Sequence, residues 1–387
     1  MNSKPNQIEP AGIYVHIPFC KSKCPYCDFY SITDTSLKQR FISAVASEMK
    51  MTSNLPFKFD TLYIGGGTPS VLETELVRQI IDTASGLYKL SPDSEVTLEI
   101  NPGTVTPEKL CGYKDAGVNR ISIGVQSFKK RNLNFLGRIH TAGEADLSIQ
   151  WAKDAGFKNI GIDLIYGIPD QTRQSWLCDL AKAVSYEPQH LSCYMLTYET
   201  GTPIKEVLQK GSFKAMSGKM LGDLFKATIE FLTGKDYVQY EISNFALNKN
   251  LRSRHNQKYW VFSPYIGLGP SAHSFIEPRR YWNKVGVEAY LEDIEKDRLP
   301  LGGYEVLSRE QMMTESIFLG LRQADGINVL KFNHRFDEDF FKMFGKQIDN
   351  FATKGFLVAN QKKCVLTIKG MLYLDSIASM LMASFKG

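Results

Sequence analysis

The sequence predicts an α/β protein: a partial, open-sided (β/α)6 barrel followed by a small winged-helix-like module at the C-terminus. Six short apolar segments alternate with helical segments through the first half of the chain, which is the pattern of parallel strands joined by right-handed crossovers. In the second to fifth units, polar and glycine-rich positions follow the C-terminal end of the strand, as they do around the mouth of a barrel. Only six units are visible, so the barrel is expected to stay open on one side.

The six predicted strands are short and rich in Val, Ile, Leu and Tyr, which is typical of buried parallel strands. They cover residues 12–18, 61–66, 95–100, 120–126, 159–167 and 190–196. Helices are expected between them, among them residues 36–51 and 106–117. In the second of these helices Thr106 is the predicted N-cap, Pro107 the first helical residue and Gly117 the C-terminal cap.

The pattern becomes irregular and aromatic-rich from about residue 200 to 300, and residues 297–305 are expected to form a linker. Ser308 and Gln311 then predict a capping box that opens a helix through Ala324. A further helix ending near Gly355, a hairpin and a final amphipathic helix complete the winged-helix-like order. The expected units are a tail over 1–11, the barrel with its aromatic-rich extension over 12–300, and the C-terminal module over 301–387.

Composition restricts the class of protein. The 387 residues carry a net charge of +5 without a block of like charges, which gives no argument for nucleic-acid binding. No apolar run approaches the ~18 residues of a membrane span, and the polar N-terminus does not resemble a signal peptide, so a cytoplasmic location is expected. The seven cysteines are an odd number, which favours a reducing compartment and clustered thiols that bind a metal.

Three cysteines, Cys20, Cys24 and Cys27, follow the first predicted strand in "HIPFCKSKCPYCDFYS" with the spacing C-x3-C-x2-C and no fourth cysteine. A structural zinc site prefers four protein ligands, usually in two separated pairs. An iron–sulfur cube held by three cysteines keeps one iron open for an exchangeable ligand. The residues alone leave three interpretations: an iron–sulfur cluster, a zinc knuckle, or three unrelated buried thiols.

The spacing resembles the signature of the radical S-adenosylmethionine (SAM) superfamily, which implies a [4Fe-4S] cluster whose open iron is chelated by SAM. The "GGGTP" segment follows the second strand, and its glycines allow a ligand close to the backbone, although a tight turn is the alternative. Glu99 ends a buried strand, where a salt bridge at the barrel rim is the alternative. The resemblance implies SAM contacts from Gly66, Gly67, Thr68 and Glu99.

The match narrows to one branch of the superfamily. "IYVHIPFCKSKCPYCDF", "YIGGGTPS", "LEINPGT", "NRISIGVQSF", "LGRIH" and "IDLIYGIPDQT" occur in order over residues 12–175. Together they are similar to the family of oxygen-independent coproporphyrinogen III oxidases and HemW-type heme chaperones, and "YEISNFA", "HNQKYW" and "GLGPSAHS" extend the similarity to the C-terminal module. The chaperone branch is the more similar of the two.

This resemblance assigns residues to two SAM sites. Contacts to the cluster-bound SAM are implied for Tyr14, Gly66 and Glu99. The positions that in the oxidase hold a second SAM are matched by Tyr26, Gly67, Thr68, Gln126, Arg138 and Asp163. The residue types agree with this, since Arg138 can pair with a carboxylate and Asp163 with an ammonium group. From the residues alone, Tyr14 could equally belong to the core.

Two positions separate the branches. The oxidase motif continues with a further cysteine, which the resemblance places at Phe29, so coproporphyrinogen oxidation is not expected.

The H-N-x-x-Y-W motif marks the chaperone branch and implies heme contacts from His255, Tyr259 and Trp260. Histidine is the commonest metal ligand and flat rings pack on a porphyrin. The alternative is a loop histidine satisfied by backbone hydrogen bonds and flanked by core aromatics. His273 is the second candidate ligand.

The predicted function is therefore to bind heme, a [4Fe-4S] cluster and SAM, and to transfer heme to an acceptor protein. A respiratory-chain acceptor and transient association with a membrane surface belong to this prediction. The alternatives are an oxygen-independent coproporphyrinogen III oxidase and a radical SAM enzyme with another substrate. The few basic residues of the C-terminal module do not form a continuous stripe, so we expect the module to act as a lid or an acceptor surface and not to bind nucleic acid.

Overall fold

The computed structural model describes residues 9–382, so most of the expected tail over 1–11 lies outside the described residues. Six parallel strands lie side by side in sequence order and form the curved sheet of a partial barrel. They are β1 (Ala11–Ile17), β2 (Phe59–Gly66), β3 (Leu90–Ile100), β4 (Arg120–Gln126), β5 (Ile160–Tyr166) and β6 (His190–Met195). All six predicted strands are confirmed, and with them the predicted fold class.

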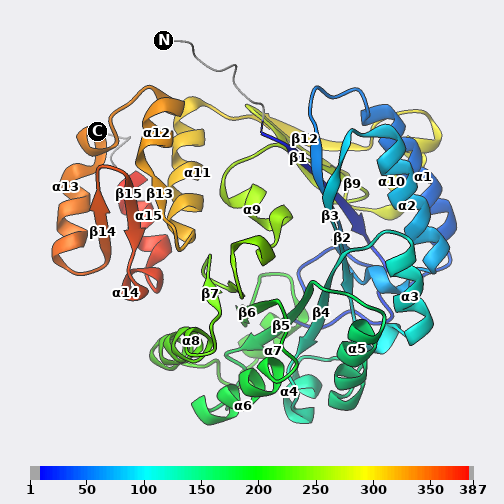
Figure 1. Cartoon of the computed structure of the whole chain (residues 1–387), viewed down its shortest axis with the longest axis horizontal. Coiled ribbons are helices and arrows are strands. Elements are labelled where there is room, and N and C mark those ends of the chain that lie inside the picture. The colour runs from blue at the N-terminus through cyan, green and yellow to red at the C-terminus, as the bar shows by residue number, and fades with distance from the viewer. Residues whose placement is uncertain (1–8, 383–387) are drawn as a thin grey trace.

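Helices follow the strands and cover the outer face of the sheet (Figure 1). They are α1 (Lys38–Thr52), α2 (Thr74–Leu87), α3 (Pro107–Asp115), α4 (Lys130–Phe135), α5 (Ala142–Asp154) and α6 (Arg173–Val184), with short 3-10 turns at Pro69–Val71 and Pro102–Thr104. The predicted cap of α3 is present: the Thr106 side chain accepts a hydrogen bond from the Lys109 amide at 3.3 Å. Gly117 follows this helix with φ of +105°, a conformation that glycine adopts without strain.

Further strands extend the sheet on both sides of the six. Beyond β1 lie β9 (Tyr265–Leu268), β10 (His273–Ile276), β11 (Arg279–Asn283) and β12 (Leu301–Val306); beyond β6 lie β8 (Asn244–Ala246) and β7 (Val238–Gln239). Of these, β9 pairs parallel with β1, and every other added strand pairs antiparallel with its neighbour. Between these strands lie α7 (Pro203–Gln209), α8 (Gly218–Thr233), a 3-10 turn (Lys249–Leu251), α9 (Arg254–Trp260) and α10 (Val287–Glu295).

The predicted linker over 297–305 is wrong, because most of it forms the edge strand β12, paired antiparallel with β11. The sequence predicts a loop here because proline and glycine are typical of loops. Gly303 has a packing reason instead: a Cβ at this position would lie 2.5 Å from the Trp282 ring. The glycine therefore leaves room for an aromatic side chain on the neighbouring strand.

The C-terminal module has its own small sheet, ordered β13-β15-β14. Its elements are α11 (Arg309–Arg322), β13 (Ile327–Asn328), α12 (Val329–Phe336), α13 (Phe340–Thr353), β14 (Leu357–Asn360), β15 (Lys363–Leu366), α14 (Ile368–Met371) and α15 (Leu374–Met382). The capping box is present, since the Ser308 and Gln311 side chains each accept the other's amide, at 3.2 and 2.7 Å. The module lies to one side of the open barrel in Figure 1, and its apolar residues belong to the same continuous core as the barrel.

Candidate functional site

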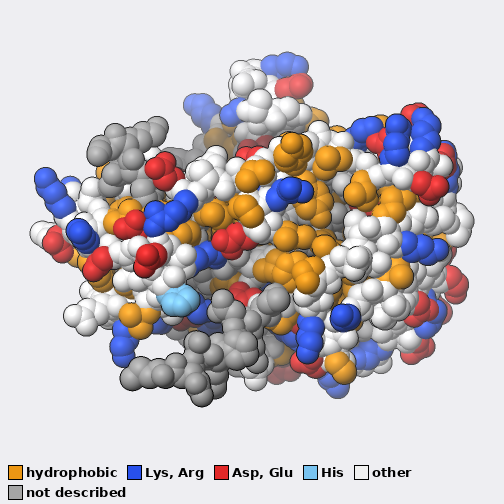
Figure 2. All heavy atoms as spheres, turned by 90° about the horizontal axis from the view of Figure 1, so that it is seen from above, with side chains coloured by type: hydrophobic (Ala, Val, Ile, Leu, Met, Phe, Trp, Pro, Cys, Tyr) orange, Lys and Arg blue, Asp and Glu red, His pale blue; other side chains and the backbone are white. Residues whose placement is uncertain are grey.

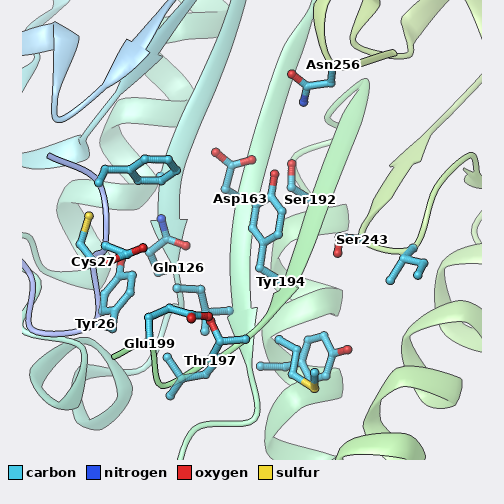
Figure 3. Close-up of a pocket in the computed structure, with 18 of the residues that line it drawn as sticks. Tyr26, Cys27, Gln126, Asp163, Ser192, Tyr194, Thr197, Glu199, Ser243 and Asn256 are labelled. Carbon is cyan, nitrogen blue, oxygen red and sulfur yellow. The ribbon is translucent and has the colours of Figure 1, made fainter. Parts of the chain in front are cut away.

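A cavity of about 1110 Å³ opens at the C-terminal ends of the parallel strands. Its walls come from the loop after β1, from β2 to β6, from α8 and from residues 371–376 of the C-terminal module. Of the predicted site residues, nine line it: Tyr26, Cys27, Gly66, Gly67, Thr68, Glu99, Gln126, Arg138 and Asp163. In Figure 3, Cys27, Tyr26 and Gln126 lie on one side of the cavity and Asp163, Ser192 and Tyr194 lie across from them.

Of the three cysteines in the loop after β1, Cys27 lines this cavity, and the other two contact residues that line it. The Cys20 thiol is buried and accepts a hydrogen bond from the Thr68 hydroxyl at 3.3 Å. The Cys24 sulfur accepts a hydrogen bond from Nη1 of Arg138 at 3.5 Å. Burial raises the pKa of the Cys27 thiol, and the neighbouring Cys24 and Cys20 raise it further, so all three thiols lie in one electrostatic neighbourhood.

These thiols do not converge on a single point. Within residues 9–382, no group of three His, Cys, Asp or Glu side chains comes together closely enough to hold one metal ion. A zinc knuckle requires such convergence, whereas in a [4Fe-4S] cluster each cysteine binds a different iron. The donor set, three thiols in one loop without a fourth cysteine and with a guanidinium beside one of them, fits a [4Fe-4S] cluster that keeps one iron open.

The glycines of "GGGTP" pack the end of β2 against the cysteine loop. Gly66 has φ of +108°, and a Cβ on Gly67 would lie 2.8 Å from the Phe19 carbonyl oxygen and 3.1 Å from the Cys20 sulfur. A side chain at Gly67 would push the cysteine loop away. The segment also faces the cavity, so the tight packing and the predicted exposure to a ligand occur together.

Glu99 ends β3 and faces the cavity in a half-buried position. It accepts hydrogen bonds from the Tyr63 hydroxyl at 2.6 Å and from the Gly66 amide at 3.2 Å. Burial raises the pKa of Glu99 from 4.5 to about 7, and these two hydrogen bonds partly oppose the shift. A carboxyl with a pKa near neutrality accepts a cationic ligand when it is ionised. No salt bridge of Glu99 is recorded among the described residues.

Gln126 and Arg138 keep polar atoms unpartnered beside the cavity. Gln126 ends β4, where the pairing with β5 shifts register, and it has φ of +65°, a strained conformation for a residue with a side chain. Its Oε1 atom and Nε of Arg138 are buried without a hydrogen-bond partner. Arg138 donates to the Gly124 carbonyl at 2.8 Å. Buried polar atoms are rarely left unpaired, so this wall is suited to a polar ligand.

Asp163 on β5 lies opposite this wall. Burial raises the pKa of Asp163, and hydrogen bonds to its carboxylate oppose the shift. The Ser122 hydroxyl is 3.0 and 3.2 Å from its two oxygens. Strand register explains the grouping, since Glu99 pairs with Ser122 and Asp163 pairs with Ser192.

Sequence analysis missed several residues of the cavity. They are Tyr63, Arg120, Ser122, Ser192, Tyr194, Asn256 and Arg322, together with Leu372 and Tyr373 of the C-terminal module. The alternation of inward-facing positions at the strand ends could have identified Tyr63, Ser122 and Ser192. Residues 371–376 of the C-terminal module line the cavity close to α8, where a Cβ on Gly222 would lie 3.5 Å from Leu372. This position agrees with the expectation that the module covers the open barrel.

Tyr14, the remaining predicted SAM contact, lies outside the cavity lining. Its hydroxyl hydrogen-bonds Nδ1 of His16 at 3.0 Å, and its ring centre lies 6.2 Å from that of Tyr63. Burial raises the pKa of Tyr14 well above its usual value, so the hydroxyl is neutral. The side chain of Tyr14, on β1 next to β2, is half-buried, and its contact with SAM stays a prediction.

His255 of the "HNQKYW" motif is buried in α9, with 1% of its surface exposed. Nδ1 lies 2.8 Å from the Thr61 hydroxyl and Nε2 lies 2.9 Å from the Tyr259 hydroxyl. Burial lowers the pKa of His255 to about 3. Both ring nitrogens are engaged, as the structural alternative required, although by side chains. The heme contact stays a prediction.

The rest of the motif faces the C-terminal module. The Arg322 guanidinium lies 4.6 Å above the Trp260 ring, and Gln323 donates to the Trp260 carbonyl at 2.9 Å. The Tyr259 ring packs edge-on against Tyr265, with centres 4.7 Å apart. The motif therefore joins the barrel to the module. His273, the second candidate ligand, is exposed and stacks on Trp282 at 5.7 Å.

Two further observations bear on function. Phe29, in place of the additional cysteine, lines the cavity with 63% of its surface exposed. It stands at the rim beside the cysteine loop and adds no donor there. In the described part of the chain, every helix is too short or too polar to span a bilayer.

Comparison with known proteins now adds to this geometry. Residues 14–180 match the family described as the radical SAM superfamily, and residues 307–373 match the HemN C-terminal domain. In structure the chain is similar to coproporphyrinogen III oxidase (HemN) from Escherichia coli, described as a radical SAM enzyme, with a TM-score of 0.83 and 23% identity over 98% of this chain and 91% of that one. At that identity the likeness establishes the fold.

Relatives in sequence are more specific. The chain is 34% identical to the heme chaperone HemW of Lactococcus lactis over 94% of each chain, and 33% identical to that of Bacillus subtilis over 93% of this chain and 96% of the relative. It is 38% identical to the Escherichia coli heme chaperone HemW over 69% of this chain and 70% of the relative. The protein belongs to the HemW family of radical SAM-type heme chaperones.

Proposed function

We propose that the protein binds heme, carries a [4Fe-4S] cluster with SAM, and transfers heme to an acceptor protein. The observation that carries this proposal is the 34% identity to a heme chaperone over 94% of both chains. Motif order and the cavity at the strand ends support it. The acceptor, including one in the respiratory chain, the cytoplasmic location and a transient contact with a membrane surface belong to the same proposal.

Cys20, Cys24 and Cys27 would hold the cluster, which supplies electrons to SAM when both are bound. The chain's own contribution is to receive a zwitterionic ligand between walls of opposite charge. Glu99 and Asp163 lie on the strand side with the Arg120 cation near them, while Arg138 supplies a second cation beside Cys24. Carboxylates pair with ammonium groups and guanidinium with carboxylates, so this wall pattern supports SAM as the ligand.

The remaining predicted contacts have distinct parts in this proposal. Tyr26 lies beside Arg138, with its hydroxyl 3.5 Å from Nη1, and offers a flat ring at the rim. Gly66, Gly67, Thr68 and Gln126 would border the SAM molecule, and Tyr14 would support them from behind. The proposal also includes a second SAM site, at the residues that match the second SAM site of the oxidase.

Oxidation of coproporphyrinogen III is the second candidate function. The observation in its favour is the size of the cavity, about 1110 Å³, which exceeds most small-ligand pockets of roughly 300–1,000 Å³ and admits a tetrapyrrole. Phe29 weighs against it, because the resemblance associates the oxidase with a cysteine there.

One reconstituted sample tests both functions. The cluster is rebuilt anaerobically, and the protein is titrated with heme while the heme absorbance is followed. The same sample is then supplied with coproporphyrinogen III, SAM and a reductant. We expect a stoichiometric heme complex and no protoporphyrinogen IX. Absence of a heme complex would contradict the proposal, and turnover would establish the second candidate.

A further inference from the structure

A heme-binding protein needs an iron ligand, and imidazole is the commonest protein choice. Four of the six histidines are buried and already hydrogen-bonded through the ring: His16, His140, His190 and His255. The other two, His273 and His334, are exposed, and no hydrogen bond of either ring is recorded in the described part of the chain. Only these two imidazoles are free to bind iron without rearrangement.

His334 lies in a second cavity, of about 620 Å³, between α12 and the barrel. Most of its lining is apolar: Phe57, Phe262, Pro264, Phe275, Ile276 and Leu330. Figure 2 views the molecule from the side where α12 and the start of β1 lie uppermost in Figure 1, and it shows apolar side chains gathered toward the centre of that face. The cavity's size is that of a site for a ligand as large as heme, within the usual range of roughly 300–1,000 Å³.

Two cations accompany the imidazole on α12. Lys331 and Arg335 both line the cavity, and the Arg335 guanidinium lies 4.7 Å from the centre of the Phe262 ring. Arg335 pairs with Glu277, and Lys331 lies 3.7 Å from Glu9. The two acids are 48% and 54% exposed in their side chains, so each can turn into solvent at little cost when another carboxylate takes its place.

We propose that this second cavity binds heme, with the His334 imidazole as the iron ligand and with Lys331 and Arg335 receiving the two propionates. The inference rests on the proposed heme-binding function and assigns its site. An apolar macrocycle with a ligand-accepting metal and two carboxylates matches apolar walls, a free imidazole and two cations. The larger cavity has no histidine among its lining residues, which leaves it to the cluster and SAM.

His273 is the weaker of the two free imidazoles. It lies on β10 with its ring stacked against Trp282, and it belongs to the lining of neither cavity. Heme bound there would rest on a strand surface without the apolar walls that exclude water. The structure therefore distinguishes the two candidates by enclosure.

The test compares His334→Ala with His273→Ala and His255→Ala in the full-length protein carrying its cluster. Heme is titrated into each variant, and the absorbance and electron paramagnetic resonance spectra report the iron ligand. We expect His334→Ala to weaken heme binding about tenfold or more and to change the spectrum, as losing a metal ligand should. His273→Ala should retain both the affinity and the spectrum of the parent.

Metal-free protoporphyrin IX provides the second measurement, because it can fill the walls without a ligand bond. Its binding should be unchanged in His334→Ala and reduced by Leu330→Glu, which places a like charge beside the propionates. If the parent binds heme and His334→Ala keeps its affinity and spectrum, or if only His273→Ala or His255→Ala loses them, this site assignment is wrong and the proposed function stands. If the parent itself binds no heme, both fail.

Discussion

The two cavities of the molecule differ in what surrounds them. The larger one, at the strand ends, is lined by carboxylates, hydroxyls and three guanidinium groups, and it keeps unpartnered polar atoms on Gln126 and Arg138. The smaller one, against α12, has a largely apolar lining and carries a free imidazole, with two cations that pair with the exposed carboxylates of Glu9 and Glu277. The first suits a compact zwitterion beside thiols, and the second suits a large apolar dianion with a metal. The difference indicates that the cluster chemistry and heme binding occupy separate sites.

Removing the cluster ligands should have the largest effect. We expect Cys20→Ser, Cys24→Ser and Cys27→Ser together to abolish iron and sulfide incorporation, because three thiolates are the proposed protein ligands. Heme binding should persist, since none of the three lines the smaller cavity. Elemental analysis and heme titration of one preparation measure both properties, with exposed Cys178→Ser as the control. Joint loss of cluster and heme in a folded protein would contradict separate sites.

The contact between barrel and module should affect both cavities. Arg322 lies 2.9 Å from Glu241 in an ion contact not aligned as a hydrogen bond, and Glu241 is fully buried. Arg322→Ala leaves that carboxylate with hydrogen bonds from Ser243 and Asn244 but without this cationic partner, so the free energy of unfolding should fall by about 3 kcal/mol.

Denaturant unfolding measures this change, and binding titrations should show that heme and SAM weaken together. Arg131→Ala is the matched control, because its ion pair with Asp170 is exposed and should contribute under about 1 kcal/mol. An Arg322→Ala protein as stable as the parent would show that this contact does not hold the module in place.

Some of this arrangement could be predicted from sequence. Parallel strands bring their C-terminal ends to one edge, so the cysteine loop, Glu99 and Asp163 were expected at a common mouth, and the structure brings Cys27 and both carboxyls to one cavity. The hydrogen bonding of the His255 ring could not be predicted in this way, because its partner Thr61 lies 194 residues away in the sequence. No local pattern reports that a ring nitrogen is already engaged. The position of Leu372 in the cavity wall also depends on tertiary packing. The same is true of β12, where pairing with β11 outweighs the local preference of proline and glycine for a loop.

Glu99 should give the larger cavity a pH dependence that the smaller one lacks. Its pKa in the folded protein, about 7, lies above its ordinary value of 4.5. The folded state therefore holds more protons between these values, and the free energy of unfolding should fall as pH rises through that window. SAM binding should strengthen over the same rise, because ionised Glu99 attracts the ammonium group. Glu99→Gln should flatten both trends.

Glu48 provides the matched control for this prediction. Burial raises its pKa to about 7 as well, but it hydrogen-bonds Tyr290, Asn283 and Gly269 and does not line the cavity. Glu48→Gln should change the pH dependence of stability and leave that of SAM affinity unaltered. Calorimetric titrations of SAM at several pH values measure the difference. An unchanged SAM profile in Glu99→Gln would remove this carboxyl from the proposed site.

Phe29 should show the smallest effect. Its ring is mostly exposed at the rim of the larger cavity, and truncation of an exposed side chain usually changes the free energy of unfolding by no more than about 0.5 kcal/mol. Phe29→Ala should therefore unfold like the parent and bind heme with the parent's affinity. Phe29→Cys should retain the iron content and gain no coproporphyrinogen III turnover, because one thiol does not rebuild the surrounding wall. Turnover gained by this single change would identify position 29 as the residue that separates chaperone from oxidase, and would place a tetrapyrrole in the larger cavity.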